Sequence, residues 1–154
     1  MTSAKGGLAV VVVAAALGLA LAAPASETVP GPIAARVLRI VDGDTLVVRA
    51  RIWLGQDVET AVRLAGVDAP ELHGACPQER DLAVAARALV ADAVAAGTVT
   101  LRNIRRDKYG GRVLARVGIP GGADLGAVLL AARLARPYHG GRRGGWCARA
   151  DAVP

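Results

Sequence analysis

The apolar residues of this chain change their spacing once, and that change limits the folds open to it. In the first half of the chain, three short runs alternate apolar with polar residues, which is typical of strands with one buried face. The runs occupy residues 36–41, 45–54 and 58–67. Asp42 and Gly43 form a turn signal after the first run, while residues 77–96 show helical spacing and end before Gly97. The pattern predicts a β-meander followed by one amphipathic helix.

The rest of the pattern adds two strands and a second helix. Residues 98–104 and 112–119 are the fourth and fifth strand candidates, and Asp124 can cap a last helix. No alternation of strands with helices is present, which argues against a parallel sheet. The sequence therefore predicts a mainly β fold with helices (α+β): a five-stranded OB-fold barrel with a helix after strand three and a C-terminal helix. A chain of 154 residues has room for one such domain.

The two ends of the chain differ in composition from this domain. Lys5 precedes an uninterrupted apolar stretch at 8–23, which is typical of a secretory leader. We therefore expect a signal peptide at 1–23 and an exported protein, periplasmic or secreted. An uncleaved N-terminal membrane anchor is the alternative. The other expected parts are a linker at 24–33, the OB-fold domain at 34–138 and a Gly/Arg-rich C-terminal tail at 139–154.

The net charge indicates the kind of partner, and the cysteines indicate the redox compartment. The formal net charge is +6, and a basic surface attracts polyanions. The two cysteines, Cys76 and Cys147, favour a disulfide because export would place them where one persists. Metal binding by two isolated cysteines with two histidines in the chain is a weaker interpretation.

Two aspartates are candidates for a shared metal ion. A hairpin that folds about Gln56 places Asp44 opposite Asp68, so that their carboxylates face each other at one end of the hairpin. Such a pair repels unless a cation or a shared proton lies between the carboxylates. Because only oxygen ligands are near, the hard ions Ca²⁺ and Mg²⁺ are favoured. A slip of one residue in the register would move one carboxylate to the opposite face.

Three further side chains complete a set suited to phosphate chemistry. Glu71 lies three residues past Asp68 and is a candidate base for a water molecule. Arg63 and Arg112 can bring guanidinium groups, which bind phosphate oxygens with two hydrogen bonds. Each residue also has a structural alternative: the aspartates can order turns, and the glutamate and arginines can be ordinary surface charges. The joint pattern favours hydrolysis of a phosphodiester.

Three segments of the chain contain the candidate residues and form an ordered set of motifs. They read IVDGDT at 40–45, VRLAGVDAPE at 62–71 and DKYGGRVLA at 107–115. In sequence, order and separation they resemble the signature segments of one family, the thermonucleases (staphylococcal-nuclease-like proteins). The resemblance covers residues 36–138. It implies an OB-fold and Ca²⁺-dependent cleavage of DNA and RNA to products that end in 3′-phosphate, with single or locally unpaired strands as preferred substrates. A monomer is expected, without a protein partner.

The resemblance also implies which residues bind the metal. By motif position, Asp44 and Asp68 would be calcium ligands, and the backbone carbonyl of Ala69 would be a third. Asp42 would not bind the metal directly but would order the turn or a metal-bound water. Ala69 stands where the family often has Thr, which a backbone ligand tolerates.

The resemblance implies roles for the remaining residues as well. Glu71 would act as general base, and Arg63 and Arg112 would stabilise the pentacoordinate phosphate. Lys108 and Tyr109 would contact the terminal phosphate and base of the nucleotide. The chain has one Gly more than the family's usual Tyr-Gly-Arg, so Arg112 reaches the site only if the loop bulges.

Stacking residues for nucleotide bases are few, because aromatic residues make up 3% of the chain. Tyr138 is the second candidate after Tyr109 for stacking on a base. Charge is therefore expected to contribute more than stacking to the binding of single strands. The main alternative function is a catalytically inactive OB-fold that binds nucleic acid, and a structural or peptide-binding barrel is a third.

Overall fold

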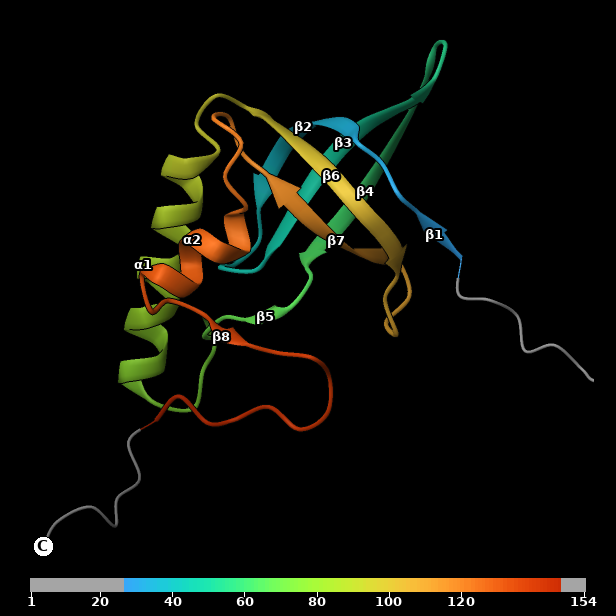
Figure 1. The fold of residues 1–154 in the computed structure, drawn as a ribbon. Helices are drawn as coiled ribbons and strands as arrows, with labels where there is room; N and C mark the ends of the chain where they lie inside the picture. The colour runs from blue at the N-terminus through green and yellow to red at the C-terminus, as the bar shows by residue number, and fades with distance from the viewer. Residues whose placement is uncertain (1–26, 148–154) are drawn as a thin grey trace, which may run out of the picture.

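The computed structural model describes residues 27–147, and five of its strands close into a barrel (Figure 1). Their order is β6-β2-β3-β4-β7, and pairing of β6 with β7 completes the ring. All neighbours are antiparallel except β4 and β7. The strands are β2 (Ile33–Ile40), β3 (Thr45–Trp53), β4 (Gln56–Leu64), β6 (Thr98–Arg106) and β7 (Arg112–Gly118). This closed barrel confirms the predicted OB-type fold.

Three two-residue strands lie outside the barrel and hold other segments of the chain in place. They are β1 (Thr28–Val29), β5 (Val67–Asp68) and β8 (Arg136–Pro137). β1 pairs with the end of β6, so the segment expected as a linker contributes a strand. β5 pairs with β8 and thereby brings the chain after β4 next to the C-terminal part. The expected signal peptide at 1–23 lies outside the described residues.

Two helices lie together on one side of the barrel, α1 (Pro77–Ala93) and α2 (Leu125–Ala131) (Figure 1). Pro77 occupies the first turn of α1, where its missing N–H costs nothing. Asp124 caps α2 as predicted, because its Oδ1 accepts a hydrogen bond of 3.0 Å from the backbone N–H of Ala127. Neither helix in residues 27–147 is long and apolar enough to cross a membrane.

The core between barrel and helices consists of aliphatic side chains. Leu46, Val48 and Val62 from the barrel are fully buried, as are Leu125 and Leu129 of α2. The sequence contains no Phe, so close packing of branched side chains fills the interior.

The expected register of the hairpin was wrong. Thr45 pairs with Arg63, and the backbone N–H of Leu64 donates to the carbonyl oxygen of Asp44 at 2.8 Å. Asp44 therefore lies opposite Leu64 and not opposite Asp68. The reason is the position of the hairpin turn. Leu54 and Gly55, with φ of 70° at Gly55, form the turn between the paired residues Trp53 and Gln56, so the hairpin does not fold about Gln56. Asp68 lies beyond β4, in the separate strand β5.

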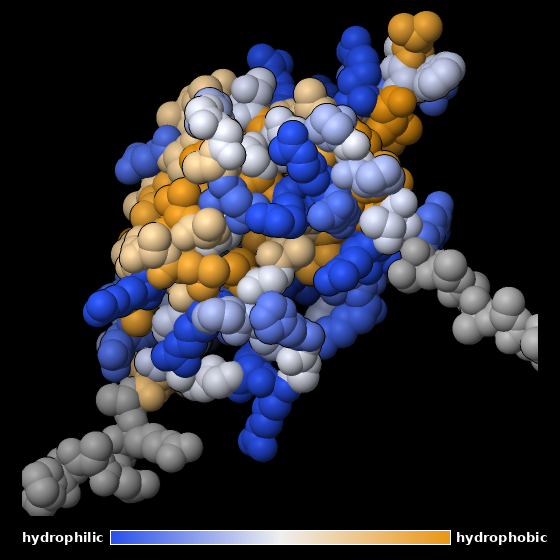
Figure 2. All heavy atoms as spheres, in the orientation of Figure 1, coloured by the Kyte–Doolittle hydropathy of each residue, from blue (hydrophilic) through white to orange (hydrophobic). Residues whose placement is uncertain are grey.

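The outer part of this hairpin projects beyond the barrel (Figure 1). Figure 2 shows apolar side chains at its tip, where Trp53 is 70% and Leu54 is 88% exposed. The inward-facing pattern of β3 therefore ends at Ala50, which is buried, while Ile52 is exposed.

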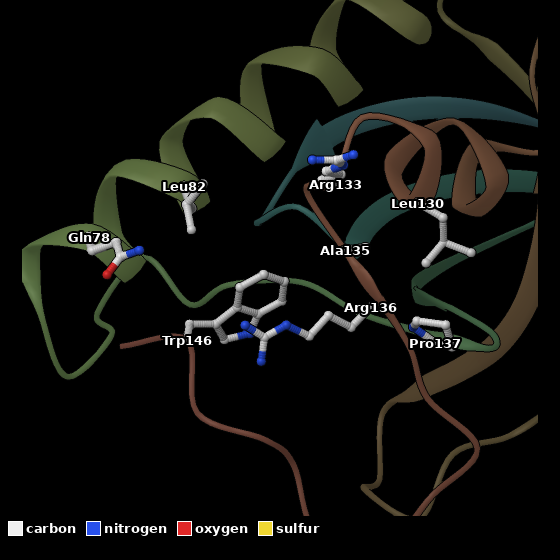
Figure 3. A pocket seen from close by; sticks show the side chains of 8 residues that line it. All are labelled: Gln78, Leu82, Leu130, Arg133, Ala135, Arg136, Pro137 and Trp146. Carbon is white, nitrogen blue, oxygen red and sulfur yellow. The ribbon is translucent and has the colours of Figure 1, made fainter. Parts of the chain in front are cut away.

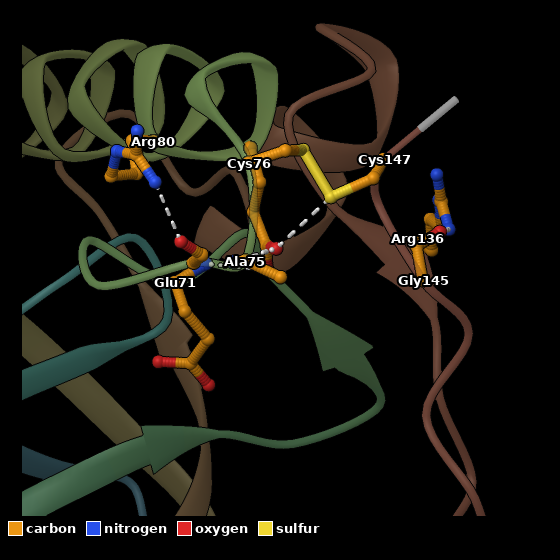
Figure 4. The surroundings of a disulfide bond; sticks show 9 residues. Glu71, Ala75, Cys76, Arg80, Arg136, Gly145 and Cys147 are labelled. Carbon is orange, nitrogen blue, oxygen red and sulfur yellow. Dashed lines mark hydrogen bonds between the residues drawn. A yellow bond between two sulfur atoms is a disulfide. The ribbon is translucent and has the colours of Figure 1, made fainter. Parts of the chain in front are cut away.

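The C-terminal residues are attached to the barrel and helices at two points. Cys147 forms a disulfide with Cys76, just before α1, with the two Cα atoms 5.9 Å apart (Figure 4). Trp146 is buried, and the guanidinium of Arg136 lies over its ring, 3.8 Å from the centroid (Figure 3). The tail expected at 139–154 is thus held in place as far as Cys147, where the described residues end.

Replacement of Gly43 by Ala should destabilise the fold, because a Cβ there would lie 2.7 Å from Cβ of Ala86 and 3.0 Å from Cβ of Ala69. We expect Gly43→Ala to lower the free energy of unfolding by about 1–3 kcal/mol in urea denaturation. Gly110→Ala is the matched control, since nothing lies within 4 Å of its Cβ position. Equal stability of the two variants would contradict the close packing of this turn on α1.

Candidate active site

Arg63 joins the two aspartates of the candidate site. Its Nη1 donates to Oδ1 of Asp44 at 2.6 Å, and its Nη2 donates to Oδ1 of Asp68 at 3.2 Å. All three residues are at most 5% exposed. Asp44 follows the turn after β2, Arg63 is near the end of β4, and Asp68 belongs to β5. Three segments of the chain therefore meet at one guanidinium.

Asp44 is held in place by its immediate surroundings. The hydroxyl of Thr45 donates to its Oδ1 at 3.0 Å, and the backbone N–H of Ala69 donates to its Oδ2 at 3.1 Å. Oδ1 of Asp42 accepts a hydrogen bond of 3.0 Å from the backbone N–H of Asp44, so Asp42 orders the turn. The carboxylate of Asp44 is therefore fixed from both sides before any ligand binds.

Burial makes the charge of Asp44 costly. Burial raises the pKa of Asp44 to about 6, Arg63 acts in the opposite direction, and Asp42 adds to the rise. A carboxylate whose charge is this poorly solvated gains from a further cation nearby. The set of oxygen donors at Asp44 and Asp68 suits a hard divalent ion.

Glu71 and Arg143 extend the cluster towards solvent. The side chain of Glu71 is 49% exposed, and its Oε1 forms an ion pair with Nη1 of Arg143. Nε of Arg143 lies 3.1 Å from Oδ1 of Asp68. Our sequence analysis missed Arg143, because the Gly/Arg-rich tail has no periodicity. The only sequence signal was Cys147, whose pairing with Cys76 brings the tail back to this side of the fold.

The loop between β6 and β7 contributes a second group of charged side chains. Nε of Arg112 contacts Oδ2 of Asp107, and its guanidinium lies 4.9 Å from the centroid of the Tyr109 ring. Nζ of Lys108 is also 4.9 Å from that centroid. Gly111 adopts φ of 81°, which accommodates the extra glycine in the turn. Arg112 thus begins β7, where it pairs with Ala61 of β4.

These groups line one cavity of about 500 Å³. It brings together Arg63, Lys108, Tyr109, Arg112, Tyr138 and Arg143. Figure 2 shows hydrophilic side chains over this region, around β5 and the segment after β8. The carboxylates of Asp44, Asp68 and Glu71 do not line the cavity themselves, but each forms an ion pair with Arg63 or Arg143, which do. Ala69 is linked to them by its backbone hydrogen bond to Asp44.

Two other places on the molecule are less suited to chemistry. A hollow of about 560 Å³ around Trp146 is lined mainly by apolar residues and arginines, and no described residue lining it is acidic (Figure 3). Cys76, Glu79 and Cys147 are the one described group of three whose potential metal ligands lie within 4.8 Å of one another. Their sulfurs are joined in the disulfide, so no thiolate is available to bind a metal.

Glu79 has a role that the sequence analysis did not assign. It lies in the first turn of α1, is 8% exposed, and accepts hydrogen bonds from the backbone N–H groups of Glu71 at 3.4 Å and Ala75 at 3.0 Å. The loop that contains Glu71 is therefore fastened to α1 (Figure 4). A glutamate three positions into a helix is a known signal for contacts with the preceding residues.

A closed five-stranded barrel with a basic cavity defines an OB-type domain of the kind that occurs in nucleases and nucleic-acid-binding proteins. Residues 61–144 match the family model described as staphylococcal nuclease homologue. Because the match covers more than half of the 154 residues, the chain belongs to this family. A comparison with curated proteins finds none that matches the chain. The match begins in β4, and Arg63 connects it to the earlier turn that carries Asp44.

Removal of the Glu79 carboxylate should loosen the loop that carries Glu71. We expect Glu79→Ala to lower the free energy of unfolding by about 1–3 kcal/mol, because two backbone N–H groups lose their acceptor. Amide hydrogen exchange at Glu71 and Ala75 should become faster. Glu59→Ala is the control, since Glu59 pairs with Arg49 on the exposed hairpin. A loss no larger than that of the control would rule out this fastening role.

Proposed function

We propose that the protein is an exported, Ca²⁺-dependent nuclease that hydrolyses DNA and RNA to products ending in 3′-phosphate. One observation carries the proposal: a buried arginine joins two aspartates beside a cavity lined by further arginines. The matched family supports a nuclease-type hydrolase. A barrel that only binds nucleic acid has no need of buried carboxylates beside its basic cavity.

The carboxylates present fit a calcium ion. Asp44 and Asp68 lie on the two Nη atoms of one guanidinium, and they are the buried carboxylates that would hold the ion. Calcium takes six to eight oxygen ligands in flexible geometry, and the backbone carbonyl of Ala69 and water would complete the set. When bound, calcium supplies positive charge that polarises the phosphate and offsets the buried negative charge of the two aspartates.

In the proposed reaction Glu71 acts as general base. Its carboxylate is half exposed, so water reaches it, and it takes a proton from the attacking water. The oxygen of that water bonds to phosphorus, the P–O5′ bond breaks, and the leaving oxygen takes a proton from solvent. The guanidiniums of Arg63 and Arg112 stabilise the extra charge on the equatorial oxygens of the phosphorane. Asp107 orients Arg112 through their ion pair.

The cavity accounts for the proposed substrates. Lys108 and Tyr109 lie on the exposed loop at its rim, where they would contact the terminal phosphate and base. Tyr138 also lines the cavity, and its backbone N–H donates to the carbonyl oxygen of Gly66 at 2.9 Å. Because a stacked base must leave its partner strand, single or locally unpaired strands are the favoured substrates.

Export is supported by two features of the chain. The apolar stretch at 8–23 after Lys5 has the form of a secretory leader. A disulfide such as that between Cys76 and Cys147 persists in oxidising compartments. We therefore propose a periplasmic or secreted enzyme.

The purified protein should degrade denatured DNA and RNA when calcium is added and stop when a chelator removes it. Mass spectrometry of the fragments should find 3′-phosphate ends. The control uses the same chelator already saturated with calcium, which should leave activity intact. Activity that persists in free chelator would rule out the metal role. Binding of the strands without cleavage would favour the inactive binding module.

Loss of the Arg112 guanidinium should slow turnover. We expect Arg112→Ala to lower kcat by about a hundredfold on single-stranded DNA, because one charge-stabilising group of the transition state is removed. Arg112→Lys should recover part of the rate, since it keeps the charge and loses the planar fork. Arg49→Ala is the control, because Arg49 pairs with Glu59 on the exposed hairpin. An unchanged rate for Arg112→Ala would show that this side chain does not reach the phosphate.

A further inference from the structure

The C-terminal segment 138–147, here called the strap, places Arg143 among the carboxylates of the site. We propose that Arg143 is a third guanidinium that binds the scissile phosphate beside Arg63 and Arg112. This inference rests on the proposed nuclease function and adds a residue from outside the three signature segments. Arg143 lines the same cavity as the other two arginines.

The strap is anchored at both ends. At its start, the backbone N–H of Tyr138 donates to Gly66, directly after the pairing of β8 with β5. At its end, Trp146 is buried and Cys147 is bonded to Cys76. Figure 1 shows the chain leaving β8, passing below β5 and returning to the start of α1. Between these two fixed points, His139, Gly140, Gly141 and Arg143 of the strap line the cavity.

Within the strap, one side chain turns towards the carboxylates. Nε of Arg143 is 3.1 Å from Oδ1 of Asp68, and its Nη1 contacts Oε1 of Glu71. Its side chain is 38% exposed, so it faces both the carboxylates and the cavity. The hydroxyl of Tyr138 donates to the carbonyl oxygen of Gly141 at 2.9 Å and shapes the strap before Arg143. Arg142 is exposed and does not line the cavity.

The contact with Glu71 links Arg143 to the reaction. Its ion pair with Glu71 places the guanidinium of Arg143 beside the carboxylate that acts as the proposed base. A phosphate attacked by water held at Glu71 would therefore lie within reach of this guanidinium, which can bind phosphate oxygens with two hydrogen bonds. Arg63 shares Asp68 with Arg143, so the two guanidiniums flank one carboxylate.

The test is the steady-state kinetics of Arg143→Gln on single-stranded DNA over a series of calcium concentrations. We expect kcat/KM to fall about tenfold or more at saturating calcium, with Arg143→Lys recovering part of the loss. Arg142→Gln is the matched control. Its kcat/KM should stay within about twofold of the wild-type value, because substitutions of exposed side chains outside the site have small effects. Thermal unfolding of each variant shows whether the fold is kept.

Two results would overturn the inference while the wild type remains active. An unchanged kcat/KM for Arg143→Gln means that the guanidinium does not contribute. A higher kcat/KM for Arg143→Gln than for the wild type at low calcium means that Arg143 competes with the cation for the carboxylates and inhibits the enzyme. An inactive wild type would instead refute the proposed function itself.

A second measurement tests whether the disulfide-anchored strap holds Arg143 in the site. Replacement of both cysteines by serine should lower kcat/KM several-fold in the wild-type background. In the Arg143→Gln background the same replacement should add less than about a twofold loss, because the two changes act through one group. Equal losses in both backgrounds would show that the strap does not present Arg143.

Discussion

The structure of the site depends on the ion pairs of Arg63 with Asp44 and Asp68. Buried charges are costly unless they are paired, so each of these three groups requires the others. The three residues come from the turn after β2, from the end of β4 and from β5. Their ion pairs therefore fix these three segments relative to one another. The cluster thus belongs to the fold as much as to the chemistry.

The same cluster explains how a small barrel keeps reactive groups close together. Burial raises the pKa of Asp44, and Arg63 together with the hydrogen bonds from Ala69 and Thr45 acts in the opposite direction. The negative charge of Asp44 is therefore poorly solvated, and a cation beside it would stabilise it strongly. Glu71 remains at the solvent edge, held from behind by Glu79, so the buried and the exposed carboxylates have different environments and suit different tasks.

The elements of the fold followed from local signals, and the details of the site did not. Asp124 caps α2 as expected, since a cap depends on its own few residues. The pairing of Asp44 with Asp68 failed as a register prediction, because the hairpin turns at Leu54 and Gly55 and so places Asp44 opposite Leu64. The two aspartates still meet, through Arg63. The position of Arg143 had no local signal, because a distant disulfide and a buried Trp146 set it.

The sequence by itself determined the strands, the helices, the barrel class and the types of side chain that gather for phosphate chemistry. These depend on short-range spacing and on signature segments, which are readable along the chain. Only the tertiary structure decided which groups touch: Arg63 between two aspartates, Glu79 behind Glu71, and Arg143 over Asp68. Such contacts join residues far apart in the chain, and their geometry is set by barrel closure and burial.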